Sequence, residues 1–171
     1  MIEKILCILE KFQTLIVGTI GFAGVVYTIY KNAQIAREQT ESIRSHDRDA
    51  FRTAIYCELE TIKDMFETRA EDLRADPPPF VILPESVPIN VYASFRSKIG
   101  LLTTEEITPI IKAYLLIEEL PMRLKVLSAH SEGGAPYEGY IYIAKEHVKN
   151  AGEMHESFLI KINEALNAIK I

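Results

Sequence analysis

The stretch LIVGTIGFAGVVYTIY, residues Leu15 to Tyr30, carries no charged side chain. The uncharged run begins at Phe12 and, as a helix of nineteen residues, spans roughly 28 Å, close to the hydrocarbon thickness of a bilayer. Tyr27 and Tyr30 stand at its end, where an aromatic ring can lie in lipid while the hydroxyl meets water. We therefore predict a transmembrane helix over residues 12–30, preceded by a short flank over residues 1–11.

Two other interpretations of this stretch fit less well. A secretion signal would have a net positive start, but Glu3 and Glu10 balance the neighbouring lysines, and no small-x-small cleavage site follows. The core helix of a water-soluble domain would carry polar residues on one face. Glycine costs a water-exposed helix about 1 kcal/mol relative to alanine, whereas in a membrane it lets another helix come close. We predict such packing at Gly18, Gly21 and Gly24.

The charges beside the stretch give its predicted orientation. Basic residues favour the cytoplasmic side. Those that follow the stretch are Lys31, Arg37, Arg44 and Arg48, against Lys4, Lys11 and the amino terminus before it. The two cysteines, Cys7 and Cys57, are placed as free thiols, which suits a reducing compartment. We expect a single-pass protein of the inner (cytoplasmic) membrane with a cytoplasmic body.

Composition limits the class of partner. The 171 residues carry a net charge of −5, and no cluster of lysine and arginine appears. Phosphate-tracking surfaces are basic, so we expect no nucleic-acid partner. The expected partners are membrane lipid and either another protein or a second copy of the chain.

Beyond Tyr30 the spacing of apolar residues predicts one long helix. It leaves the membrane as a polar stalk over residues 31–49, and a coiled-coil seam between protomers is the alternative for that stalk. From residue 50 apolar side chains recur with helical spacing, namely Phe51, Ile55, Leu59, Ile62, Phe66 and Leu73. A bundle domain over residues 50–171 should begin here, and the proline run after Asp76 should end its first helix.

A Pro-rich loop is predicted over residues 76–88. Prolines enclose four apolar residues in it, Phe80, Val81, Ile82 and Leu83. They either dock a partner or fold onto the core of the bundle, and we favour the second interpretation.

Three further helices are predicted. Asn90 is a candidate N-cap for a short helix that ends near Gly100. Thr103 and Glu106 have the spacing of a capping box for the next helix, although Pro109 should make its first turns irregular. From Tyr137 to the end a 3-4 repeat forms a bundle seam that includes Ile141, Val148, His155, Phe158 and Ile162. The predicted fold is all-α, with an antiparallel bundle of three to four helices and no strand.

The sequence contains no recognisable catalytic, phosphate-binding or metal motif, so we expect no enzyme activity and no cofactor. His155 fits a core histidine with its hydrogen bonds satisfied, or a buried polar residue that helps to specify how the helices pair. We expect a non-enzymatic, membrane-tethered bundle that binds or scaffolds a protein partner at the inner membrane. The alternative is an extracytoplasmic ligand sensor anchored by one span, with a pocket among Tyr92, Phe95, Tyr114 and Tyr140.

The layout also resembles a group of small, mostly uncharacterised bacterial proteins with a single membrane pass. The resemblance rests on the span, on the helix ending RTAIYCELETI at residues 52–62, and on VYASFRSKIGLLTTEEITPIIKAYLLIEEL at residues 91–120. It implies a membrane anchor and an all-helical body. It implies no reaction and assigns no functional residue.

Overall fold

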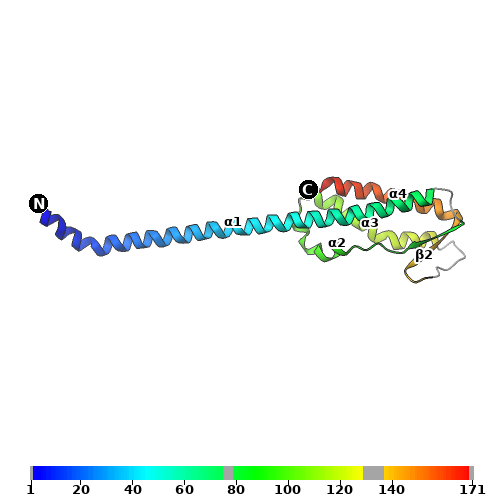
Figure 1. Cartoon of the computed structure of the whole chain (residues 1–171). Coiled ribbons are helices and arrows are strands. Elements are labelled where there is room, and N and C mark those ends of the chain that lie inside the picture. Colours follow the sequence, from blue (N-terminus) through cyan, green and yellow to red (C-terminus); the bar gives the residue numbers. More distant parts are fainter. Residues whose placement is uncertain (1, 75–78, 129–136, 170–171) are drawn as a thin grey trace. The chain divides into compact units, whose positions relative to one another are not determined.

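The computed structural model describes residues 2–74, 79–128 and 137–169, and it is mostly helical (Figure 1). The elements in chain order are α1 (Ile2–Arg74), β1 (Phe80–Pro84), α2 (Asn90–Phe95), the 3-10 helix η1 (Arg96–Leu101), α3 (Thr104–Ser128), β2 (Tyr140–Ala144) and α4 (Lys145–Ala168). The chain divides into two compact units, Met1–His46 and Asp47–Ile171. Residues 76–78 of the predicted Pro-rich loop lie outside the described ranges.

The first unit consists of the amino-terminal part of α1. Every side chain from Leu15 to Tyr30 is exposed. Among the described residues, α1 is the one helix long and apolar enough to cross a membrane, and none of its most apolar window is buried. By length and composition alone, such a helix near an amino terminus can be a membrane span or a signal sequence.

The second unit has a core between α1, α3 and α4. The stripe of α1 that faces this core is buried along its whole length, at Phe51, Ile55, Leu59, Ile62, Phe66, Ala70 and Leu73. Burial of each large side chain contributes about 1.5–3 kcal/mol. The helical spacing predicted for this segment is therefore confirmed.

The three long helices of the second unit do not all alternate in direction. Arg52 meets Glu106, and further on Glu58 meets Tyr114, so α1 and α3 run parallel. Phe66 lies against Phe158 while Arg74 pairs with the earlier Glu156, so α4 runs antiparallel to α1. The predicted antiparallel bundle is correct for α4 and wrong for α3. The chain returns along the bundle between α1 and α3 as β1, α2 and η1, which explains the parallel pair (Figure 1).

The prediction of an all-α fold without strands is wrong in one respect. β1 and β2 form a two-stranded antiparallel sheet in which Phe80 pairs with Ala144 and Pro84 with Tyr140. The segment predicted as a loop over 76–88 thus contains a strand. Ile141, predicted to lie on the helical seam, is instead in β2, and α4 begins at Lys145.

The start of α2 also differs from the prediction. Asn90 is the first helical residue, and the N-cap position is held by Ile89, which has no side-chain cap. The carboxylate of Glu58 on α1 takes the capping role: it accepts hydrogen bonds from the backbone N–H of Val91 at 2.7 Å and of Tyr92 at 3.0 Å. A carboxylate supplied from another helix therefore satisfies N–H groups that α2 itself leaves unpaired.

The capping box at the start of α3 is confirmed. The backbone N–H of Thr103 donates to Oε2 of Glu106 at 2.8 Å, and the N–H of Glu106 donates to Oγ1 of Thr103 at 3.4 Å. The irregularity expected at Pro109 is absent, because α3 continues through both Pro109 and Pro121. Pro109 has no N–H to donate to the backbone carbonyl of residue 105. The side chain of residue 105 is exposed in the first turn of α3, so the missing hydrogen bond falls at the exposed start of the helix.

Glu106 is also the buried half of an ion pair with the part-buried Arg52. Its side chain is 0 % exposed, its Oε1 lies 2.8 Å from Nε of Arg52, and its Oε2 accepts a hydrogen bond from Nη2 of Arg52 at 3.0 Å. The hydrogen bond to Glu106 raises the pKa of Arg52. One carboxylate thus caps α3 and joins it to α1.

The substitution Glu106→Gln should lower the free energy of unfolding by about 2 kcal/mol, because it removes the buried carboxylate charge that pairs with Arg52 and leaves that part-buried guanidinium only the exposed carboxylate of Asp49. The matched control is Glu105→Gln, which removes a charge from the same helical turn at an exposed position and should cost about 0.5 kcal/mol. Urea unfolding of the full chain in detergent, followed by circular dichroism, measures both. Equal losses in the two variants would contradict the role given to the ion pair.

Candidate functional site

The two-stranded sheet presents different faces to the core and to solvent. Because side chains alternate along a strand, Val81, Leu83, Ile141 and Ile143 point to one face. Three of these four are buried and the fourth is half-buried, so this face packs onto the core of the second unit.

The opposite face, called here the docking face, is formed by Phe80, Ile82, Pro84, Tyr140, Tyr142 and Ala144. None of these side chains is charged, although the solvated face of an antiparallel sheet is normally polar. Phe80 is 47 % exposed and Tyr140 is 46 % exposed. The other four side chains are half-buried, so the face is a partly exposed apolar surface, which is typical of an interaction site.

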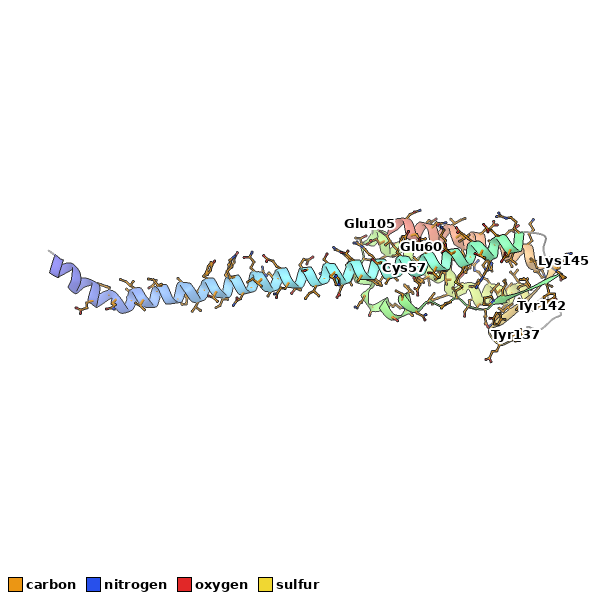
Figure 2. The ribbon with its side chains drawn as sticks, in the orientation of Figure 1. Cys57, Glu60, Glu105, Tyr137, Tyr142 and Lys145 are labelled. Carbon is orange, nitrogen blue, oxygen red and sulfur yellow. The ribbon has the colours of Figure 1, made fainter. Side chains whose placement is uncertain are left out.

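Aromatic contacts organise the docking face. The rings of Phe80 and Tyr142 stack across the two strands with centroids 5.4 Å apart. Tyr140 meets the edge of Tyr137, just before β2, with centroids 6.3 Å apart. Figure 2 shows Tyr137 and Tyr142 at the same end of the second unit. The stacking holds the rings in a defined arrangement at the surface.

The four residues predicted for partner docking divide between the two faces. Phe80 and Ile82 lie on the docking face, whereas Val81 and Leu83 point to the core. Sequence reasoning gave Tyr140 only as a lining residue of the alternative ligand pocket, and it assigned neither Tyr140 nor Tyr142 to a docking surface. The alternation in YIYIA, residues 140–144, was the available signal, but the same residues also fitted the helical 3-4 repeat.

The predicted packing glycines, Gly18, Gly21 and Gly24, lie on the exposed apolar part of α1. A Cβ atom added at any of them would have no heavy atom outside its own helical surroundings within 4 Å. The predicted approach of a second helix at these glycines therefore stays a prediction.

The four aromatic residues predicted to line a ligand pocket do not share one site. Tyr92 and Tyr114 are buried and stack directly, with centroids 3.9 Å apart, and the hydroxyl of Tyr114 donates to Oε2 of Glu58 at 2.6 Å. Burial and this hydrogen bond raise the pKa of Tyr114 far above its usual range. Tyr140 is on the docking face, and the side chain of Phe95 is outside the described part.

A shallow groove lies beside Glu58. It has a volume of about 410 Å³ and runs between α1 and the segment before α2, lined among others by Cys57, Thr61, Met65 and Pro88. The thiol of Cys57 is free and exposed there. Figure 2 marks Cys57 and Glu60 on this stretch of α1.

The predicted seam residues of α4 lie in the core. Val148, His155, Phe158 and Ile162 are each no more than 1 % exposed. His155 packs edge-on against Phe66 of α1, with ring centroids 5.2 Å apart. Burial lowers the pKa of His155, and the positive charge of Arg69 lowers it further, against the effect of a hydrogen bond to the carbonyl of Ala151.

The described residues contain no group of three or more histidine, cysteine, aspartate or glutamate side chains that could hold a metal ion. Comparison of the chain with models of known families, with curated protein sequences and with solved structures finds no match in any of the three. The resemblance to small bacterial membrane-anchored proteins therefore stays a prediction, and the proposals below rest on the geometry of this chain.

Proposed function

We propose that the protein is a membrane-tethered helical bundle that binds a protein partner and performs no chemical reaction. The observation that carries the proposal is the continuity of α1. One helix contains a fully exposed apolar stretch, Leu15–Tyr30, and later the buried stripe from Phe51 to Leu73. The apolar stretch is stabilised if lipid surrounds it, whereas the stripe is stabilised by packing against the other helices of the bundle.

The proposed location is the inner membrane, with the bundle in the cytoplasm. This orientation rests on the excess of basic residues after the apolar stretch. The exposed free thiol of Cys57 fits a reducing compartment. An extracytoplasmic ligand sensor would need the opposite topology and a pocket that the stacked pair Tyr92–Tyr114 does not offer.

Cys57 provides a direct test of this orientation. With Cys7 replaced by Ser, Cys57 is the one remaining thiol of the chain. In intact cells a membrane-permeant maleimide should label it, and an impermeant maleimide should label it only after the cells are opened, because its exposed thiol faces the cytoplasm. Cys57→Ser in the same background is the control for background labelling. Labelling of intact cells by the impermeant reagent would reverse the proposed topology.

The docking face is the surface proposed to contact the partner. It combines exposed aromatic rings with the absence of any charge, a composition enriched at the centres of protein interfaces. Tyrosine and phenylalanine supply a large contact area with few rotatable bonds, so binding costs little side-chain entropy.

A photo-crosslinking residue tests this contact. Placed at Tyr140 in the full chain, it should give a discrete crosslinked product in membranes, because this exposed ring would lie against the partner. Placed at Ile160, an exposed apolar residue of α4, it should not. The double substitution Phe80→Ser and Tyr142→Ser should abolish the product from position 140.

The mass of the crosslinked product shows whether the partner is a second copy of this chain or another protein, because two crosslinked copies have twice the mass of one chain. The same set of products from positions 140 and 160, or none from position 140, would contradict the docking face. Circular dichroism of each variant verifies that the bundle remains folded.

A further inference from the structure

The contact between α1 and α4 contains two buried polar atoms without a hydrogen-bond partner. They are Nε2 of His155 and Nη1 of Arg69, and neither finds a partner anywhere in the described part of the chain. His155 is 0 % exposed. Both side chains adjoin the ring of Phe66: Arg69 has its Cζ 5.9 Å from the ring centroid, and His155 approaches edge-on. Unpaired polar atoms in such a position are costly, and natural cores keep few of them.

The hydrogen bonding of His155 defines its protonation state in the closed bundle. Its Nδ1 lies 2.7 Å from the carbonyl oxygen of Ala151, which can only accept, so Nδ1 carries the hydrogen. The neutral ring then has a bare lone pair on Nε2. A proton added to Nε2 would be a buried N–H donor with no acceptor, on a ring that has become a cation.

The charged groups around His155 offer no compensation. From α1 the facing group is Arg69, a cation. From α3, Arg123 lies over the ring of Phe158, which like His155 packs against Phe66, and the charge of Arg123 is already paired with Glu119. On α4 itself the neighbouring Glu156 is paired with Arg74. A protonated His155 would therefore face the positive charge of Arg69 in a buried position against the ring of Phe66.

We propose that His155 is an acid-sensitive lock on the contact between α1 and α4. The neutral ring packs edge-on against Phe66 of α1, which also contacts Phe158 of α4, and so helps to hold the two helices together. When the ring takes up a proton, the imidazolium is repelled by Arg69 and has no contact with water in the closed bundle. Both effects favour separation of the two helices. Opening lets water reach both charges and exposes the phenylalanine rings. The inference goes beyond partner binding and does not require that α1 crosses a membrane.

The sign of the pH dependence follows from linkage. Burial lowers the pKa of His155 in the closed form, while in the opened form the ring has the ordinary histidine pKa of about 6.5. The opened form therefore binds more protons, and the closed form loses stability as the pH falls below about 6.5. As long as the closed form stays neutral, the ratio of opened to closed molecules rises about 25-fold between pH 7 and pH 5.

Amide hydrogen exchange of the full chain in detergent tests the proposal. After correction for the intrinsic pH dependence, residues 62–73 and 148–162 should exchange about 25-fold faster at pH 5 than at pH 7, while residues 110–120 of α3 change less. His155→Phe, which keeps an aromatic ring among aromatic neighbours, should abolish this difference. Arg69→Met should reduce it, because the repelling charge is gone. The matched control His46→Asn, at an exposed histidine, should behave like the wild type.

Three results would overturn the proposal. The first is the same pH response in wild type and His155→Phe. The second is an acid-induced increase of equal size in α3, which would mean general unfolding. The third comes from NMR titration of the wild-type imidazole and does not depend on any variant folding: titration of His155 at its ordinary pKa, with no change in exchange, would show that protonation does not open the contact.

Discussion

The whole arrangement depends on one helix having to satisfy two kinds of surroundings. In the first unit α1 presents large apolar side chains on every side, and nothing in the described chain covers them. Each such side chain left in water forgoes about 1.5–3 kcal/mol relative to burial. In the second unit the same helix places its apolar residues on one stripe and covers it with α3 and α4. The first part of α1 is stable only if a non-aqueous medium covers all its sides, whereas the second part needs only a covered stripe. This difference is the physical reason for proposing a membrane tether.

The second unit uses carboxylates of one helix to satisfy the ends of others. Glu58 of α1 accepts from the first N–H groups of α2 and from the hydroxyl of Tyr114, while Glu106 caps α3 and binds Arg52 of α1. These contacts pair α1 with a parallel helix, which needs a long return connection. That connection supplies β1, and β1 with β2 produces the uncharged aromatic face proposed to bind a partner. The polar contacts and the candidate site are thus parts of the same topology.

The features that could be predicted from the sequence are those encoded locally. The stripe from Phe51 to Leu73 repeats with helical spacing, and Thr103 and Glu106 are three residues apart in one turn, so both could be recognised without a partner. The sheet could not. Its strands are five residues each and lie far apart in the chain, and prolines beside β1 are typical of a loop. Ile141 fitted the helical repeat as well as the strand alternation, so the start of α4 was placed too early.

The remaining features depend on tertiary contacts. Asn90 is a reasonable N-cap by residue type, but the carboxylate that caps α2 comes from residue 58, more than thirty positions earlier. The seam repeat placed His155 in the core, yet only the folded chain brings it next to Arg69. The docking face is likewise visible only once Phe80 and Tyr142 stack across the sheet.

The most direct test of the central claim is whether the full chain stays with membranes after alkaline carbonate extraction of broken cells. The account predicts that the chain is recovered in the membrane pellet and is released only by detergent, because the segment from Leu15 to Tyr30 lies in lipid. Recovery of the intact, folded chain in the supernatant without detergent would contradict it.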